Sequence, residues 1–306
     1  MISLKTFIEE VNGKRIDEQI AWIDVLEYID GLLPDLTFPL YQNTVNKHDK
    51  LLYATICSIK ELKRAKASII SFLMNASLYP KEIFVVSDGT WNEEEGKANF
   101  GKMASIVRFI SWEDLIPKIE PLIPSLTHWA LKQIWGRKLL TILALSFDSP
   151  LLFADSDILW FNTPLSPNEI EEISLKLSTD NSHNYDQNYI NNFKMGILNN
   201  TLNPVNCGVV FIKNCMNLIT DRAMECIKYE SQNPGKYSEQ TFFAILNLDY
   251  SDMWTNHEII SSIDDIIADF NKSLPIQNAY IARHYVWRLK WVFWKDYIKM
   301  RLALWK

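Results

Sequence analysis

The sequence of 306 residues predicts an α/β fold with a mostly parallel central sheet flanked by helices. Three observations support this fold class. Short apolar runs typical of buried strands alternate with longer segments of helical periodicity. Acidic side chains follow several of these strands, and α/β sheets bind ligands at the carboxyl ends of their strands. Hydrophobic residues make up 48% of the chain and charged residues 22%, as in a globular protein.

Residues 1–48 are expected to form a helical extension ahead of the sheet. Apolar side chains recur among acids at helical spacing over residues 16–33, and Pro34 and Pro39 end that helix. A single domain is expected over residues 49–286. Its first half, residues 49–161, has predicted strands at 51–57, 82–89, 105–112 and within 149–161, and predicted helices at 60–77 and 127–146.

The second half of the domain, residues 162–286, begins with a polar segment rich in asparagine. We expect a helix and then a long loop over residues 162–204, and a loop of this length is usually a lid or a binding loop. A strand at 207–212 and helices at about 216–230 and 238–246 follow.

Residues 287–306 form a predicted basic, tryptophan-rich C-terminal helix. Its apolar stripe consists of Trp287, Trp291, Trp294, Ile298, Leu302 and Trp305. Two interpretations are open. The helix packs on the core and closes the domain, or it lies on an anionic membrane as a peripheral contact.

Charge and composition exclude several classes of protein. The net charge is -6, so there is no basic surface for nucleic acid. Only 9 glycines occur, which disfavours a glycine-rich phosphate loop. The four cysteines form no CxxC pair, so we expect free, buried thiols. Glu9 and Glu10 stand where a signal peptide would be apolar, and the uncharged stretches are too short to span a bilayer. A cytoplasmic protein is expected, peripheral on the inner membrane face if its C-terminal helix binds lipid.

The sharpest motif is Phe153-Ala154-Asp155-Ser156-Asp157-Ile158, in which two aspartates follow an apolar strand. The backbone turns at the end of a strand, and the two carboxylates can then converge on one hard cation. Mg²⁺ and Mn²⁺ prefer oxygen ligands, and Mg²⁺ is typically shared between carboxylates and phosphate oxygens. The alternative is a solvated turn that carries two acids.

Lys138 falls on the apolar face of the predicted helix at 127–146. The apolar residues of that face are Leu131, Trp135, Ile142 and Leu145. A buried ammonium needs a carboxylate or phosphate partner, whereas a lysine at the edge of the face would extend to water.

Two further positions have both a functional and a structural interpretation. His284 follows an apolar stretch and is either a metal ligand or a structural histidine. Gly208 opens a strand two residues after Asn206. It would allow a ligand to approach the backbone closely, or it marks a bulge or tight turn.

Taken together, these residues resemble nucleotide-sugar glycosyltransferases of the GT-A type. The nearest likeness is to the glycogenin-like and galactosyltransferase-like group, family eight. Four segments match in order over roughly residues 51–285: a first strand and helix, the Asp-x-Asp strand, the Asn-Cys-Gly strand with a later Glu-Gln helix, and a C-terminal histidine. The resemblance implies a Rossmann-type GT-A sheet.

The resemblance also implies a role for each site residue. Asp155 would contact the donor ribose and the metal, Asp157 would bind the metal, and His284 would complete the coordination of Mn²⁺ or Mg²⁺. The donor-binding residues implied are Tyr53, Thr55, Ile56, Asp88, Lys138, Asp155, Ser156 and Gly208. The residues implied for catalysis at the sugar and acceptor side are Lys138, Asn206, Glu239 and Gln240. Where the family has a glycine and a lysine after the histidine, Arg288 or Lys290 would supply the charge for the diphosphate.

The predicted function is metal-dependent transfer of a sugar from a nucleotide diphosphate sugar, by resemblance a UDP-sugar. The acceptor would be a hydroxyl of a glycan, a lipid-linked sugar or a protein. An inverting enzyme would use Glu239 or Asp186 as general base, and a retaining one front-face attack or a short-lived covalent species.

Three alternatives compete with this function. A phosphatase of the haloacid-dehalogenase type would use Asp155 and Asp157, but it expects Thr or Val where Leu159 stands. A sugar-nucleotide pyrophosphorylase needs a glycine-rich loop after the first strand, and residues 57–66 contain no glycine. A non-catalytic protein that binds nucleotide sugars is the third.

Overall fold

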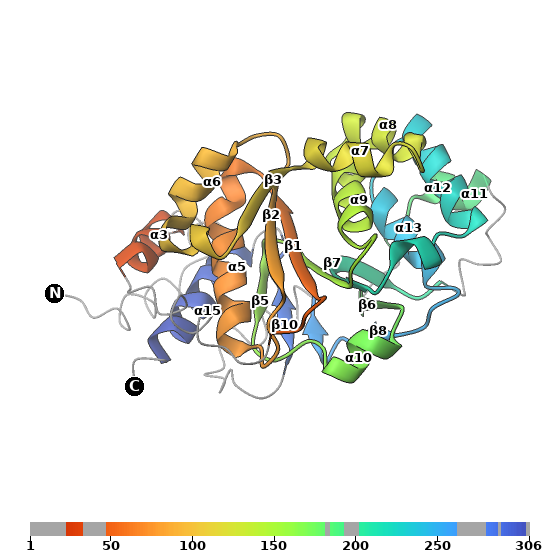
Figure 1. The fold of residues 1–306 in the computed structure, drawn as a ribbon. Coiled ribbons are helices and arrows are strands. Elements are labelled where there is room, and N and C mark those ends of the chain that lie inside the picture. Colours follow the sequence, from red (N-terminus) through yellow and green to blue (C-terminus); the bar gives the residue numbers. More distant parts are fainter. Residues whose placement is uncertain are drawn as a thin grey trace.

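The computed structural model describes residues 23–32, 47–180, 184–192, 202–261, 280–286 and 289–303. These residues contain a seven-stranded sheet with the order β3-β2-β1-β4-β7-β6-β8 and a three-stranded sheet with the order β5-β10-β9 (Figure 1). The strands are β1 Leu52–Cys57, β2 Glu82–Ser87, β3 Arg108–Ser111, β4 Leu151–Ala154, β5 Ile158–Trp160, β6 Leu175–Thr179, β7 Val205–Ile212, β8 Met253–Trp254, β9 Ile259–Ile260 and β10 Ala282–His284.

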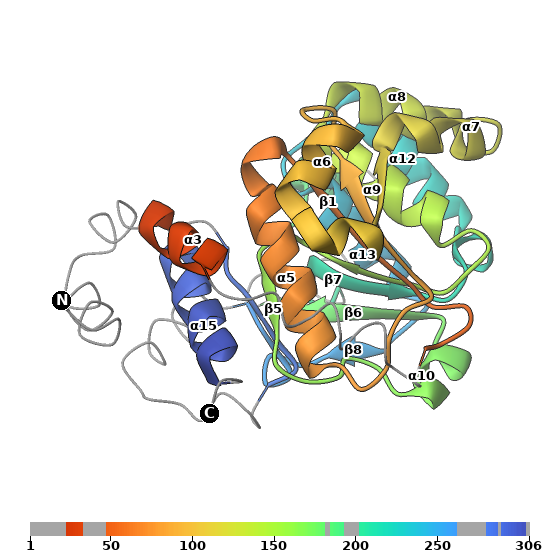
Figure 2. The same cartoon turned by 60° about the vertical axis from the view of Figure 1, so that its left-hand side comes forward.

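Helices cover both faces of the large sheet (Figures 1 and 2). The described helices are α3 Ile23–Leu32, α5 Leu62–Asn75, α6 Glu93–Phe100, α7 Ile116–Ile119, α8 Pro124–Lys132, α9 Ile134–Leu145, α10 Pro167–Glu172, α11 Gln187–Asn192, α12 Asp221–Gln232, α13 Ser238–Leu246 and α15 Lys290–Ala303. One apolar core joins the sheet to α5, α6 and α15, and a second joins it to α8, α9, α12 and α13.

The directions of the strands explain where a site can form. Strands β3, β2, β1 and β4 are parallel, so their carboxyl ends share one edge of the sheet. Strand β7 runs antiparallel to β4 and brings its amino end to that same edge. The predicted α/β class with a mostly parallel sheet is therefore confirmed, and residues that follow β4 meet residues that begin β7.

The predicted single helix over residues 127–146 is wrong, because the chain breaks into α8 and α9. Gln133 between them is extended, with φ −146° and ψ 149°. The break lets Gly136 approach α8 so closely that a Cβ there would lie 2.6 Å from the backbone nitrogen of Ala130. Leu131 belongs to the other helix and is 60% exposed, so the predicted apolar face does not exist as one surface.

The segment 162–204 differs from the predicted helix and long loop. It contains the buried strand β6, in which Leu175 and Leu177 alternate with polar residues at the period of a strand. Two short helices, α10 and α11, lie on either side of β6. Residues 181–183 and 193–201 lie outside the described residues. The predicted strand within residues 149–161 is two strands of different sheets, β4 and β5, joined by the Asp-Ser-Asp turn.

The C-terminal helix α15 packs on the core and does not expose an apolar stripe. Trp291 and Trp294 are 0% and 1% exposed, and the flanking Lys295 is also buried. Helix α15 lies beside α3 (Figure 2) and contacts both α3 and α5, and residues 291–298 are all buried. The core-packing interpretation is therefore the one the structure supports. Arg288 and the terminal tryptophans Trp287 and Trp305 lie outside the described residues.

Two expectations on covalent and membrane features can be compared with the structure. The four cysteines, Cys57, Cys207, Cys215 and Cys226, are free and buried, as predicted. Among the described residues, no helix has both the length and the apolar character needed to cross a bilayer.

Candidate functional site

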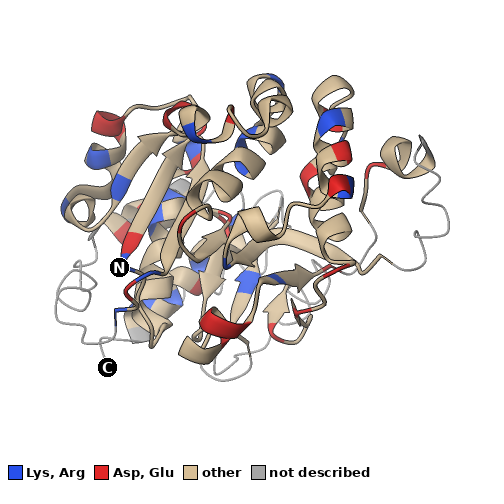
Figure 3. Ribbon diagram, turned by 45° about the vertical axis from the view of Figure 1, so that its right-hand side comes forward, with Lys and Arg blue, Asp and Glu red and all other residues tan. Residues whose placement is uncertain are grey.

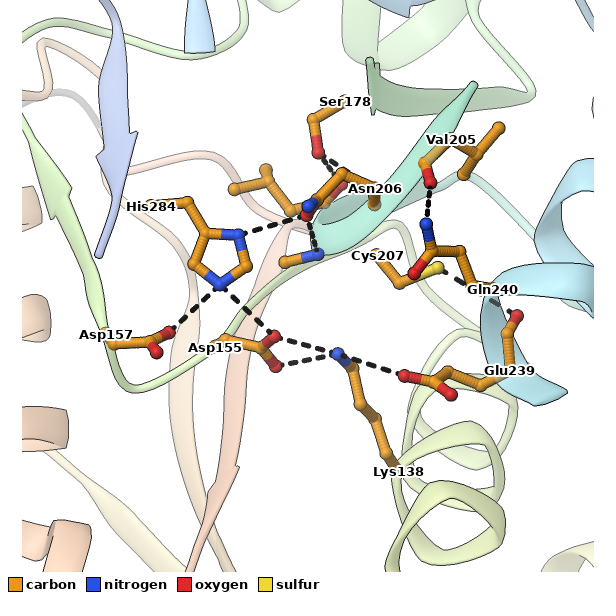
Figure 4. A network of polar contacts seen from close by, with 12 residues as sticks. Lys138, Asp155, Asp157, Ser178, Val205, Asn206, Cys207, Glu239, Gln240 and His284 are labelled. Atoms are coloured by element: carbon orange, nitrogen blue, oxygen red, sulfur yellow. Dashed lines mark hydrogen bonds and ion pairs between the residues drawn. The ribbon is translucent and has the colours of Figure 1, made fainter. Parts of the chain in front are cut away.

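Three side chains that could bind a metal ion converge at the edge of the sheet. Asp155 follows β4, Asp157 precedes β5, and His284 ends β10. The Nε2 atom of His284 lies 3.2 Å from an Asp157 carboxylate oxygen and 3.9 Å from an Asp155 oxygen (Figure 4). One ligand atom from each residue lies within 4.8 Å of the other two. One cation can therefore contact all three.

Backbone pairing brings these side chains together from distant parts of the sequence. Strand β10 pairs antiparallel with β5, and His284 is in register with Ile158. The next residue, Tyr285, donates its backbone N–H to the carbonyl of Asp157 at 2.9 Å. Asp155 donates its backbone N–H to the carbonyl of Gly208 at 2.8 Å. The three candidate ligands therefore stand on backbone that is hydrogen-bonded to neighbouring strands.

Asn206 orients the histidine ring. Its Oδ1 atom accepts the Gly208 backbone N–H at 2.7 Å and lies 3.1 Å from His284 Nδ1. Because Oδ1 is an acceptor, Nδ1 carries a proton and donates it, and Nε2 faces the two aspartates. An imidazole held by its second nitrogen in this way is typical of metal ligands.

Gly208 makes room for that ring. A Cβ at this position would lie 2.5 Å from His284 Nδ1 and Cε1. The two carboxylates and the oriented imidazole together form a set of oxygen and nitrogen ligands that fits a divalent cation.

Lys138 finds its carboxylate partner in Asp155. Its Nζ atom lies 2.8 and 2.9 Å from the two Asp155 oxygens and 4.0 Å from an oxygen of Glu239. Burial alone would lower the pKa of Lys138, but Asp155 and Glu239 outweigh burial and raise it, so the ammonium stays charged.

The pKa values of His284, Asp157 and Glu239 are shifted in different directions. Burial would lower the pKa of His284 and raise that of Asp157. Their mutual attraction outweighs burial with the help of Arg64 and Lys138 at Asp157 and of Asp155 at His284, so the pKa of His284 is raised and that of Asp157 is lowered. Burial raises the pKa of Glu239 against the opposing effect of Lys138. The site thus holds an ionised Asp157 and, in Glu239, a carboxyl group of raised basicity.

Two cavities meet at this cluster. The larger has a volume of about 500 Å³ and the smaller about 230 Å³. Both are lined by Trp135, Lys138, Asp155 and Asp157. An elongated ligand could therefore occupy both cavities while its central part faces the two aspartates and the lysine.

Most of the predicted site residues line one of the two cavities. The smaller is lined by Ile56, Asp88 and Ser156 in addition to the shared residues. The larger is lined by Asn206, Gly208, Glu239, Gln240 and His284 in addition to the shared residues.

Some predicted residues lie elsewhere. Tyr53 is in the core, where its hydroxyl accepts the Trp160 indole N–H at 3.2 Å, and Thr55 is 1% exposed in the same strand. Both precede the carboxyl end of β1 and therefore do not reach the cavity. Lys290 is exposed at the start of α15 and lines neither cavity, and Arg288 lies outside the described residues.

Asp186 is not placed to act as the general base. Its Oδ1 atom accepts the backbone N–H groups of Asn188 and Tyr189 at 2.8 and 3.2 Å, at the start of α11. It lines neither cavity.

Several cavity residues were not predicted. Ser58 and Glu61 line the smaller cavity because they follow the carboxyl end of β1. The predicted end of this strand at Cys57 could have indicated both residues. Trp135 was assigned to a buried face, yet it is 38% exposed at the junction of the cavities. Asp180 follows the unpredicted strand β6 and accepts a hydrogen bond from Gln240 Nε2 at 3.0 Å.

Comparison with known proteins supports the fold. No protein-family model matches the sequence, and no curated protein sequence matches it. Among solved structures, the chain is similar to the galactosyltransferase LgtC in complex with donor and acceptor sugar analogs. The TM-score is 0.52 at 15% identity, over 82% of this chain and 95% of that chain. It is also similar to the bifunctional glycosyltransferase WbbM, with a TM-score of 0.51 at 13% identity, over 85% of this chain and half of that chain (50%). The chain therefore has the GT-A-type fold that the sequence resemblance predicted.

Proposed function

We propose that this protein is a metal-dependent glycosyltransferase that moves a sugar from a nucleotide diphosphate sugar to an acceptor hydroxyl. The observation that carries the proposal is the cluster of Asp155, Asp157 and His284 at the junction of two cavities. A diphosphate at this junction would leave the nucleoside in the smaller cavity and the sugar in the larger. The fold likeness to a galactosyltransferase solved with donor and acceptor sugar analogs supports this assignment. By family resemblance we propose a UDP-sugar and Mn²⁺ or Mg²⁺.

We assign separate roles in the reaction to the metal-binding residues and to Lys138. Asp155, Asp157 and His284 would hold the cation, which when bound supplies positive charge to the diphosphate. Lys138 adds a permanent positive charge at the same junction, where negative charge develops on the leaving diphosphate. Its bidentate contact with Asp155 also fixes the position of that carboxylate.

Glu239 is the carboxylate to which we assign a role at the sugar. It lines the larger cavity and lies 4.0 Å from Lys138. In an inverting reaction it would take the proton of the acceptor hydroxyl, and its raised pKa suits that role. In a retaining reaction it would face the oxocarbenium-like sugar together with Gln240.

For the acceptor we propose a glycan hydroxyl rather than a lipid-linked sugar or a protein. The larger cavity carries the hydrogen-bonding side chains of Asp180, Asn184 and Gln240 beyond the charged cluster. A membrane contact through residues 287–306 has lost its main support, because Trp291 and Trp294 are buried.

The free buried cysteines agree with a reducing compartment, and we propose the cytoplasm.

A thermal-shift panel of nucleotide sugars, with and without Mn²⁺, tests this function. We expect one sugar nucleotide to raise the melting temperature by several degrees only when Mn²⁺ is present, because a ligand that binds the folded state stabilises it. Stabilisation by no nucleotide sugar, together with trapping of an aspartyl-phosphate on Asp155, would favour the phosphatase alternative instead. Stabilisation without transfer to any acceptor would favour a non-catalytic binding protein.

A further inference from the structure

A buried carboxylate lies behind the metal-binding histidine, on the opposite side of strand β10 from the cavities. Asp296 of α15 is the only acidic residue in positions 287–306 and is 5% exposed. Its Oδ2 atom accepts a hydrogen bond from the Tyr285 hydroxyl at 2.9 Å and from Arg283 Nη1 at 3.2 Å. Lys295 Nζ lies 3.7 Å from its other oxygen.

The two residues that donate hydrogen bonds to Asp296 Oδ2 are the sequence neighbours of His284. Side chains alternate between the two faces of a strand, so His284 points to the cavity while Arg283 and Tyr285 point away from it. One carboxylate therefore holds both neighbours of the candidate ligand. The backbone of β10 is paired with β5 and β9, which restricts its position further.

Helix α15 is itself held firmly. The Tyr285 ring packs edge-on against Phe293, with ring centroids 5.5 Å apart. At the other end of the helix, Arg301 Nη1 contacts Asp30 of α3 at 3.1 Å. Removing one member of a buried ion pair such as Arg283 and Asp296 is costly, so the loss of Asp296 should displace the strand rather than leave it unchanged.

We propose that Asp296 is a positioning residue for His284, so that the C-terminal helix is part of the support of the metal site. The role of the cation rests on the proposed function, whereas the placement of the histidine ring does not. Removing a direct hydrogen-bond partner of a metal ligand typically changes metal affinity by about 10–100-fold, and because Asp296 acts through the neighbours of His284 we expect the lower end of this range.

The first test observes the ring without metal. The imidazole nitrogens of His284 are followed by long-range ¹H–¹⁵N NMR and assigned with His284→Asn. We expect Asp296→Asn to shift or broaden the His284 signals and Asp30→Asn to leave them unchanged. The second substitution removes an ion pair of the same helix far from β10, so it is a matched control. Unchanged His284 signals in folded Asp296→Asn protein would overturn the proposal.

The second test titrates Mn²⁺ alone and measures the free ion by electron paramagnetic resonance. We expect Asp296→Asn to weaken Mn²⁺ binding by about 10-fold or more, and Asp30→Asn by less than about twofold. Tyr285→Phe keeps the Arg283 pair and should weaken binding by a smaller factor. If Asp296→Asn does not fold, this variant decides, because unchanged binding and unchanged His284 signals in Tyr285→Phe would contradict the proposal. If the unsubstituted protein binds no Mn²⁺, the proposed function fails, and the NMR test alone decides the role of Asp296.

Discussion

At the scale of single residues, the site depends on the glycine at position 208, where a side chain would collide with the His284 ring. We predict that Gly208→Ala weakens Mn²⁺ binding by about 10-fold or more, because a methyl group would occupy the space of the His284 ring. Overpacking of this kind typically costs about 1–3 kcal/mol of stability. Mn²⁺ titration and chemical denaturation measure the two effects separately.

Gly96 offers a matched control for this substitution. A Cβ there would lie 2.8 Å from the Trp91 and Phe109 rings, far from the metal cluster. Gly96→Ala should therefore lose comparable stability and retain its Mn²⁺ affinity. If the two variants bind Mn²⁺ equally well, the account of Gly208 is wrong.

Glu230 gives the stability of the protein a distinctive pH dependence. It is 0% exposed and accepts hydrogen bonds from the Ser238 hydroxyl at 2.6 Å and the Gly235 N–H at 3.2 Å. Burial, with a contribution from Asp186, raises its pKa from 4.5 to about 7. The folded state therefore binds the proton more tightly than the unfolded state. This contribution to stability is fully present below pH 4.5 and is lost as the pH rises to about 7.

We predict that Glu230→Gln removes this dependence, because the amide imitates the protonated carboxyl group. The free energy of unfolding should be measured for both proteins from pH 4.5 to 8. Relative to the unsubstituted protein, the variant should gain about 1–3 kcal/mol across this range, with no further gain above pH 7. A constant difference at all pH values would contradict the prediction.

The sequence could predict the charged residues of the site but not all of its walls. Asp155 and Asp157 stood out as paired acids after an apolar strand, and Lys138 as a charge on an apolar helix face. His284 was assigned to the metal only by the family resemblance. Tyr53 and Thr55, which the resemblance assigned to the nucleoside pocket, are buried in β1 and line neither of the two cavities. The predicted strand 51–57 already ended at Cys57, as β1 does, so residues that follow Cys57 could have been expected at the pocket instead.

At the scale of elements, the corner between α8 and α9 brings Lys138 to the site. No proline marks the break at Gln133, and the helical spacing of apolar residues continues across it, so the sequence predicted one helix over residues 127–146. The break is stabilised by tertiary contact, in which the Arg137 guanidinium donates to the carbonyls of Ala130 at 3.1 Å and Asp88 at 2.5 Å. Strand β6 was missed because its local sequence signal is weak. Only five residues carry its alternation, inside a polar segment.

We predict that Gly136→Ala opens this corner. The new Cβ would meet the backbone of α8 at 2.6–2.8 Å, and backbone atoms cannot move aside as a side chain can. The expected loss of stability is about 1–3 kcal/mol, measured by chemical denaturation. Gly31→Ala is the matched control, because Gly31 is also helical but has nothing within 4 Å of its Cβ position. That variant should be unchanged or up to about 1 kcal/mol more stable. Equal stabilities of the two variants would show that the corner is not tightly packed.

At the scale of the whole molecule, basic and acidic residues are mixed along the chain (Figure 3). Of the four basic residues of α15, Lys290 is exposed and Lys299 is half-buried. Lys295 and Arg301 are buried, and they lie near Asp296 and Asp30, respectively. The ion pairs of Asp296 with Arg283 and of Arg301 with Asp30 therefore join α15 to β10 and to α3.

The central claim is that Asp155, Asp157 and His284 hold a cation that the transfer reaction needs. The most direct measurement is the turnover of the sugar nucleotide identified in the thermal-shift panel, with Mn²⁺ present, by the unsubstituted protein and by Asp157→Asn. We expect the substitution to lower turnover by about 100-fold or more, while the melting temperature without ligand stays close to that of the unsubstituted protein. Unchanged turnover by Asp157→Asn would contradict the account.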